Sequence, residues 1–198
     1  MEQLLELDRN LLLAINGWTS PIADKIMLFF SAIPVWIPLY VIIVALFFYP
    51  KWQTFKSEKV PFWVVGLFSV AAVGICFGLC DQVSCFIKES IQRFRPGHEP
   101  ALEGMVTLLE GKGGNYGFVS SHAANTFGLA TLTALIFRKK PYAVAMFLWA
   151  AIVSYSRVYL AKHYPLDVIC GAFLGIAIAI SVYYVWKYAL YKYEMHRR

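Results

Sequence analysis

Long apolar runs separated by short polar segments dominate the pattern of this chain. Each run is close to the length of about 20 residues that a membrane-spanning helix needs. The pattern therefore predicts five spans. They cover approximately residues 24–49, 60–88, 120–137, 142–160 and 165–186.

The first run contains Pro34 and Pro38, which are expected to kink its helix. A rival count would divide this run near Pro34 into two spans. Each half would then hold only about ten apolar residues, which is too short to cross a bilayer. The five-span count is therefore favoured.

Residues 1–16 show a different pattern, in which leucines alternate with acidic and amide side chains. A helix with this pattern is too polar to span and suits the membrane interface. Residues 17–21 contain Gly17 and Pro21 and should end it.

Composition agrees with this picture, because 59% of residues are hydrophobic and only 15% are charged. Soluble domains carry roughly a quarter charged residues. The fold class expected is an all-α integral membrane protein, with a bundle of about five transmembrane helices and an N-terminal interfacial helix. We expect a single membrane-embedded domain over residues 1–198, with its motif-bearing core at 60–188.

The distribution of charge predicts the orientation. The loop 50–59, the turn 138–141 and the tail after Trp186 together carry ten Lys and Arg residues against two acids, and the other side carries eight against ten. The positive-inside rule makes the first side cytoplasmic, so the N-terminus and the 89–118 loop lie outside. The net charge of +6 is thus explained by topology and not by a nucleic-acid partner. A bacterial inner membrane with a periplasmic site is expected, and the oligomeric state stays open.

This topology gathers costly polar residues at the outer ends of the spans. Ionisable groups in such positions are a functional hypothesis by default. The residues in question are Lys88, Arg95, Ser120, Ser121, His122, Arg157, His163 and Asp167.

The stretch around His163 is the most informative of these. Asp167 lies four residues later, so its carboxylate can orient the imidazole. Pro165 fits the first turn of a helix, which would begin just after His163. Two helix N-termini with free N–H groups and three nearby cations, Lys88, Arg95 and Arg157, suit a multiply charged oxyanion such as phosphate.

Neighbouring residues have plainer interpretations. Arg93 and Lys162 are expected to face lipid or solvent, and His98 to lie in a loop turn or to contact a headgroup. Gly171 and Gly175 form a small-xxx-small pair that favours helix packing.

Three ordered motifs carry a resemblance to a known family. They are Lys88 followed after six residues by Arg95-Pro96, then Val119-Ser120-Ser121-His122, and last Ser156-Arg157 with His163 and Asp167 at fixed spacing. The chain resembles the type-2 phosphatidic acid phosphatase superfamily of membrane lipid phosphatases, which shares its site with vanadium haloperoxidases. The middle motif departs from the family's Pro-Ser-Gly-His, since Val119 and Ser121 replace the proline and the glycine.

The resemblance implies a role for each residue. His163 would be the nucleophile that forms a phosphohistidine, with its ring held by Asp167. His122 would be the general acid and then the base. The phosphoryl oxygens would be bound by Lys88, Arg95, Ser120 and Arg157, and by the backbone N–H of Ser121, whose side chain could tighten the pocket.

The expected function is a metal-independent lipid phosphate phosphatase with no cofactor, acting on undecaprenyl pyrophosphate. Phosphatidylglycerophosphate, phosphatidic acid and lipid A are alternative substrates, and a lipid phosphotransferase is an alternative reaction. A non-catalytic binder or transporter of lipid phosphate would need only the cations. A metal site at His98, His122 and His163 is disfavoured, because the surrounding Lys and Arg would repel a metal ion.

Overall fold

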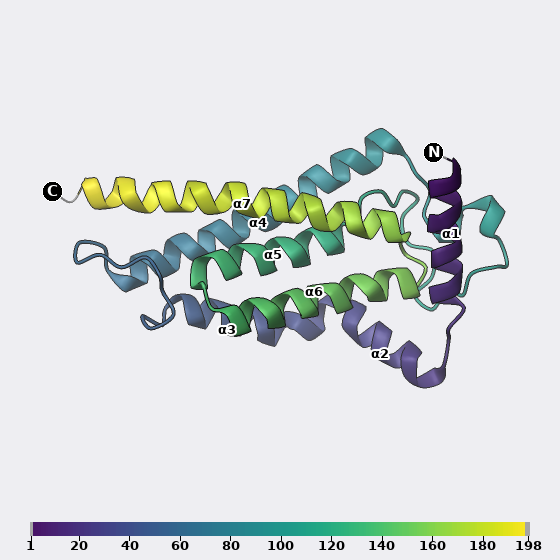
Figure 1. The fold of residues 1–198 in the computed structure, drawn as a ribbon, viewed down its shortest axis with the longest axis horizontal. Coiled ribbons are helices and arrows are strands. Elements are labelled where there is room, and N and C mark those ends of the chain that lie inside the picture. The colour runs from purple at the N-terminus through teal and green to yellow at the C-terminus, as the bar shows by residue number, and fades with distance from the viewer. Residues whose placement is uncertain (1, 197–198) are drawn as a thin grey trace.

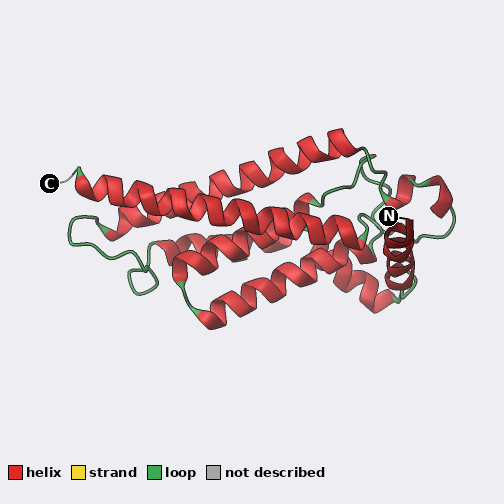
Figure 2. Cartoon of the chain, turned by 45° about the horizontal axis from the view of Figure 1, so that its top comes forward, coloured by secondary structure: helices red, strands yellow, loops and turns green. Residues whose placement is uncertain are grey.

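The computed structural model describes residues 2–196, and within this range the chain forms helices and no extended strand. Two of the short 3-10 turns, η2 (Pro96–His98) and η3 (Pro100–Leu102), lie in the long loop before α5. Figure 2 shows that helix makes up most of the molecule. The α-helices are α1 (Glu2–Asn16), α2 (Pro21–Ser31), α3 (Ile37–Phe47), α4 (Phe62–Ile91), α5 (Ser121–Phe137), α6 (Lys140–Tyr159) and α7 (Pro165–Met195).

Helices α3 to α7 run along the long axis of the molecule, α2 lies obliquely to them, and α1 crosses one end of the bundle (Figure 1). Helix α5 lies at the centre and packs against α4, α6 and α7. Two glycines of α7 permit its close approach to α5. A Cβ atom at Gly175 would lie 2.1 Å from the carbonyl oxygen of Ala124, and one at Gly171 would lie 2.5 Å from that of Ser120. The packing role predicted for this glycine pair is confirmed.

The first predicted span is broken. Helix α2 ends at Ser31, a 3-10 turn η1 follows at Ile33–Trp36, and α3 then leaves at a bend of 67°. Pro34 and Pro38 lie within the first residues of η1 and α3, where a missing N–H costs little. The predicted kink is confirmed, and each half has 11 residues.

Three helices, α4, α6 and α7, are long and apolar enough to cross a membrane, and the bent α2–α3 pair is a fourth candidate. Helix α5 has 17 residues, or roughly 25 Å at 1.5 Å per residue. With α2–α3 taken as one segment, the chain passes along the bundle five times (Figure 1). This agrees with the integral membrane protein predicted.

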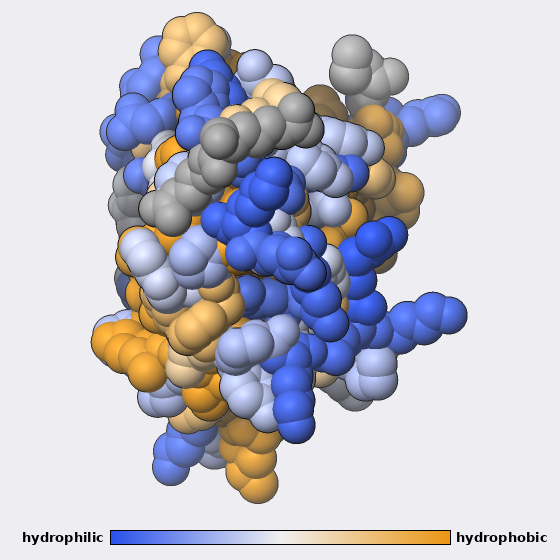
Figure 3. Space-filling model, turned by 90° about the vertical axis from the view of Figure 1, so that its left-hand side faces the viewer, coloured by the Kyte–Doolittle hydropathy of each residue, from blue (hydrophilic) through white to orange (hydrophobic). Residues whose placement is uncertain are grey.

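The end of the bundle away from α1 carries the basic segments. Figure 3 looks onto this end and shows hydrophilic side chains gathered there above and beside hydrophobic ones. Lys51, Lys56, Lys59, Arg138, Lys139, Lys140, Lys187 and Lys192 belong to these segments. Arg197 and Arg198, which entered the charge count, lie outside the described residues.

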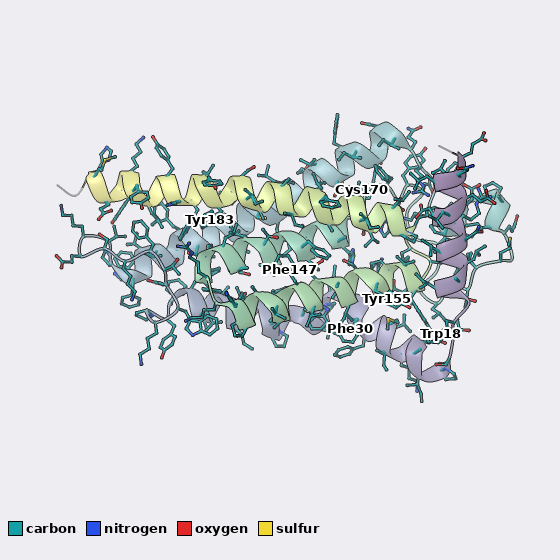
Figure 4. The ribbon with its side chains drawn as sticks, in the orientation of Figure 1. Trp18, Phe30, Phe147, Tyr155, Cys170 and Tyr183 are labelled. Carbon is teal, nitrogen blue, oxygen red and sulfur yellow. The ribbon has the colours of Figure 1, made fainter. Side chains whose placement is uncertain are left out.

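The opposite end is closed by α1 and the turn after it. Asp8, Leu12 and Asn16 form the buried face of α1. The Asn16 side chain donates to the Tyr159 carbonyl at 2.7 Å and so ties α1 to the end of α6. Trp18, labelled in Figure 4 just beyond α1, is 80% exposed. Such aromatic side chains favour the membrane interface.

Candidate active site

A cavity of about 800 Å³ lies at the end of the bundle that carries α1 and the 92–120 loop. Its walls come from α2, the turn after α2, α3, α4, the loop, α5 and α6, and from the segment between α6 and α7. Residues as far apart in the sequence as Ser31 and His163 are thus brought together at one membrane level. The predicted site residues that line it are Lys88, Arg95, Ser121, His122, Arg157 and His163.

His163 and Asp167 are held by the start of α7. Tyr164 is the N-cap of this helix, and its N–H donates to Asp167 Oδ2 at 3.0 Å. Pro165 occupies the first turn, as predicted. Asp167 Oδ2 is 3.6 Å from His163 Nδ1, which has no hydrogen-bond partner at this distance. The carboxylate therefore faces the ring, with its own orientation determined by the helix cap.

His163 lies where protonation is unfavourable. Its side chain is 2% exposed. Burial lowers the pKa of His163 to about 4, an effect that the nearby Asp167 carboxylate opposes. The imidazole is therefore neutral at neutral pH, with an available lone pair.

Three cations face the cavity, and they have few partners. Lys88 donates to the hydroxyl of Ser121, and Arg95 donates from Nε to the Tyr116 carbonyl at 3.1 Å. Arg157 is 6% exposed, and its Nε has no partner. Burial lowers the pKa of Arg95, but a guanidinium remains charged in proteins. Cations in such surroundings favour a bound anion.

The Arg157 side chain already has one acidic neighbour. Its Nη1 is 3.3 Å from Glu110 Oε2 and also donates to Ser31 Oγ. Glu110 comes from the 92–120 loop, and its other carboxylate oxygen accepts from Ser31 at 3.1 Å. The carboxylate thus occupies part of the environment that a phosphate would need.

The two serines of the middle motif lie differently. Ser120 is fully buried as the N-cap of α5, with its Oγ 3.5 Å from the Ala123 nitrogen. Ser121 lines the cavity, and its Oγ is 2.7 Å from Ser84 Oγ. The Ser121 hydroxyl also accepts a hydrogen bond from Lys88. Ser121, which replaces the glycine of the Pro-Ser-Gly-His motif, therefore orients Lys88.

Two expectations about basic residues are wrong. Arg93 does not face lipid or solvent, because it donates to Asp167 Oδ1 at 2.7 Å and to Asp8 Oδ2 at 2.6 Å. Lys162 is 5% exposed and donates to the carbonyls of Glu110 and Gly111, both at 2.9 Å. Tertiary contacts with residues far along the chain supply partners that local sequence does not show.

The start of α7 also differs from expectation. Its N-terminus was predicted to offer free N–H groups to an anion. The Leu166 N–H instead donates to Asp8 Oδ1 at 2.8 Å. His98 lies in the η2 turn, as the loop interpretation predicted, with Nε2 3.1 Å from the Gly113 carbonyl oxygen.

One close approach of the loop backbone, at Gly117, is not predicted from the sequence. A Cβ atom at Gly117 would lie 3.0 Å from Asp167 Oδ2, 3.2 Å from Arg95 Cγ and 3.5 Å from His163 Nδ1. Glycine at this position therefore lets the loop cover the His163–Asp167 pair. The glycine-rich loop composition was the available signal, but it did not distinguish Gly117 from its neighbours.

The family model described as PAP2 superfamily matches residues 62–191, which include all three motifs and most of the cavity wall. The chain belongs to the PAP2 superfamily. It is therefore a lipid phosphatase of the PAP2 kind embedded in a membrane, and the resemblance seen in the motifs is confirmed.

Curated relatives align with most of this chain. A lipid A 4'-phosphatase of Porphyromonas gingivalis is 37% identical over 96% of this chain and 77% of the relative. A lipid A 4'-phosphatase of Bacteroides thetaiotaomicron is 36% identical over 88% of this chain and 75% of the relative. A putative undecaprenyl-diphosphatase of Escherichia coli is 25% identical over 63% of each chain.

Two solved PAP2 structures have the same fold. LpxE of Aquifex aeolicus superposes with a TM-score of 0.68 and 25% identity over 89% of this chain and 94% of its own. A phosphatidylglycerolphosphate phosphatase of Bacillus subtilis superposes with a TM-score of 0.66 and 24% identity, over 97% of this chain and 88% of its own. The latter likeness concerns the fold alone.

Proposed function

We propose that this protein removes the 4'-phosphate of a lipid A-type glycolipid. The observation that carries this proposal is the identity of 37% over 96% of the chain to a lipid A 4'-phosphatase. Lipid A was an alternative in the sequence analysis, and it is better supported than undecaprenyl pyrophosphate, which was the main expectation.

The lining of the cavity supports a sugar-bearing substrate. Besides the cations, the cavity contains the side chains of Asp81, Glu89, Asn115 and Asn125. Oδ1 of Asn125 is buried and has no hydrogen-bond partner. Carboxylates and amides can bind hydroxyl and amide groups of a glucosamine, whereas the carboxylates would repel the additional charge of a diphosphate.

An apolar part of the cavity suits the acyl chains. Ile33, Trp36, Tyr40, Phe77 and Val153 line it alongside the polar groups. Trp36 and Tyr40 come from the bent first segment and Phe77 from α4. Acyl chains that enter from a bilayer leave surroundings that are already apolar, so contacts with these side chains replace contacts with lipid.

In the proposed reaction, His163 attacks phosphorus through Nε2, because Nδ1 faces Asp167. The N–P bond forms as the bond from phosphorus to the sugar oxygen breaks, and His122 donates a proton to that oxygen. Water then attacks phosphorus, His122 takes its proton, and the N–P bond breaks to release phosphate. Asp167 stabilises the positive charge that the imidazole carries between these steps.

The fixed cations carry out the electrostatic part of this reaction. Lys88, Arg95 and Arg157 bind the three non-bridging oxygens, on which negative charge is spread in the transition state. Ser120 stabilises the start of α5, and Ser121 holds Lys88 in place. These groups supply the charge stabilisation for which other phosphatases use a metal ion.

The proposed orientation has the site on the extracytoplasmic face of a bacterial inner membrane. The basic segments at the other end of the bundle favour the cytoplasmic side. The 4'-phosphate would then lie at the level of α1, with the acyl chains in the outer leaflet.

The test is phosphate release from bisphosphorylated lipid A by purified protein in detergent with EDTA, with His163→Ala as control. Loss of one phosphate, with the acid-labile anomeric phosphate retained, is the expected result. Release from undecaprenyl pyrophosphate alone would favour the second candidate. Activity abolished by EDTA, or fully retained by His163→Ala, would contradict the proposed mechanism.

A further inference from the structure

A buried carboxylate of α1 lies behind the His163–Asp167 pair. Asp8 is 2% exposed, whereas Glu2 and Glu6 of the same helix are exposed. Burying a carboxylate is costly unless the group is paired and hydrogen-bonded. Asp8 has both kinds of partner: Oδ1 accepts from the Leu166 N–H at 2.8 Å, and Oδ2 accepts from Arg93 Nη2 at 2.6 Å.

Arg93 connects this carboxylate to Asp167. Its two terminal nitrogens reach different carboxylates, since Nη1 donates to Asp167 Oδ1 at 2.7 Å. The guanidinium also lies over the ring of Tyr164, 3.9 Å from the centroid. A planar fork with several donors can bridge two carboxylates in this way, which a lysine ammonium does less well.

The contacts of Asp167 leave it little freedom. Arg93 holds Oδ1, and the Tyr164 N–H holds Oδ2, the oxygen that faces His163 Nδ1. Without Arg93, Oδ1 would lose its ionic partner, and rotation of the carboxylate would move Oδ2 away from the ring. Without the charge of Asp8, the Arg93 cation would be neutralised by Asp167 alone, which would weaken the attraction of Asp167 for an imidazolium.

We propose that Asp8 and Arg93 are positioning residues, which orient the Asp167 carboxylate and preserve its negative charge for His163. The inference rests on the proposed function, in which His163 becomes cationic during the reaction. It makes α1 a part of the active site, although α1 lies outside the matched family region of residues 62–191. Neither Asp8 nor Arg93 touches the substrate in this scheme.

The experiment compares Asp8→Asn, Arg93→Gln, Arg93→Lys and the Asp8→Asn/Arg93→Gln double variant in the lipid A assay. Asparagine can still accept from the Leu166 N–H, so Asp8→Asn removes the charge and keeps the helix cap. Glu6→Gln, at an exposed position on the same helix, is the matched control. Thermal midpoints in detergent identify any variant that is poorly folded.

The expected result is a kcat lowered about 10-fold by Asp8→Asn and about 100-fold by Arg93→Gln, with KM within about 3-fold of wild type. Arg93→Lys should recover part of the loss, and the double variant should equal Arg93→Gln, because both residues act through one carboxylate. Glu6→Gln should match wild type.

The inference is overturned if Asp8→Asn retains the wild-type kcat, or if the effects of the two single variants multiply in the double variant. A loss seen only in KM would also overturn it. Failure of the proposed function gives a separate result, because wild type itself would then release no phosphate from lipid A, and the same variants would be compared on undecaprenyl pyrophosphate.

Discussion

The two sides of His163 differ in how their charges are paired. On the cavity side, Lys88, Arg95 and Arg157 have mostly neutral partners, and Glu110 is the acidic group that contacts Arg157. On the opposite side, Arg93 lies between two buried carboxylates, and each has further hydrogen bonds. The first side has spare positive charge for an anion, whereas the second is complete without a ligand. Binding and orientation are thus assigned to different sides of one ring.

The largest effect expected from this division belongs to Asp167→Asn. An amide cannot stabilise the imidazolium, so kcat should fall roughly 10³-fold while KM changes little. Steady-state phosphate release measures both constants. A change confined to KM would place Asp167 on the substrate-binding side and break the comparison.

On the cavity side, Arg157→Gln should lower kcat/KM roughly 10²-fold, which is the usual effect of removing one donor to a developing charge. Vanadate, which mimics the transferred phosphoryl group, should inhibit this variant much less strongly than wild type. Unchanged inhibition by vanadate would mean that Arg157 does not contact the anion.

The burial of His163, between the two sides, predicts a pH-dependent stability. The folded pKa is about 4 and the unfolded pKa is about 6.5, so the unfolded chain binds the additional proton between these values. Stability should therefore fall as the pH falls through this window, by roughly 2 kcal/mol at pH 5. His163→Gln should show a shallower decline of the thermal midpoint between pH 7 and 5. If the thermal midpoints of wild type and His163→Gln fell equally between pH 7 and 5, the lowered pKa of His163 would be contradicted.

Gly117 lies between the cavity side and the Asp167 side of His163, and Gly117→Ala should disturb both sides modestly. The new methyl group would press on Asp167 Oδ2 and Arg95, so kcat/KM should fall about 10-fold. Gly74→Ala is the control, because a Cβ atom there meets nothing within 4 Å. Equal activities of the two variants would show that the loop moves aside freely.

The smallest effect should come from Glu110→Gln. Without this carboxylate, the charge of Arg157 is no longer partly neutralised when the substrate binds. KM should therefore fall about 3-fold, which corresponds to a binding free energy of less than 1 kcal/mol. A rise in KM, measured by the same assay, would instead indicate that Glu110 holds Arg157 in its binding position.

Hydropathy and motifs predict much of this molecule, because both are local. The starts of α4, α5, α6 and α7 lie within two residues of the predicted span limits. Pro165 begins α7, and the three motifs meet at one cavity. These features depend on runs of apolar residues and on spacings that one stretch of sequence contains.

The pairing behind the ring could not be predicted in this way. Asp8 looks like a residue of the polar face of an amphipathic helix, and Arg93 looks like a basic residue after a span. Asp8 and Arg93 are 85 positions apart in the sequence, and Arg93 and Asp167 are 74 positions apart. The packing of α1 onto the end of the bundle determines both contacts, and nothing local distinguishes a buried carboxylate from an exposed one.

The break between α2 and α3 has a consequence for kinetics. Within the described residues, α4 packs against α3, α5 and α7 but not against α2, and the cavity lies partly between α4 and the broken segment. A lipid anchored by its acyl chains approaches such a flank by diffusing sideways within its leaflet. The search is then two-dimensional, and turnover follows the mole fraction of substrate among the surrounding lipids. Diluting it with inert detergent in mixed micelles would slow the reaction even at a constant bulk concentration.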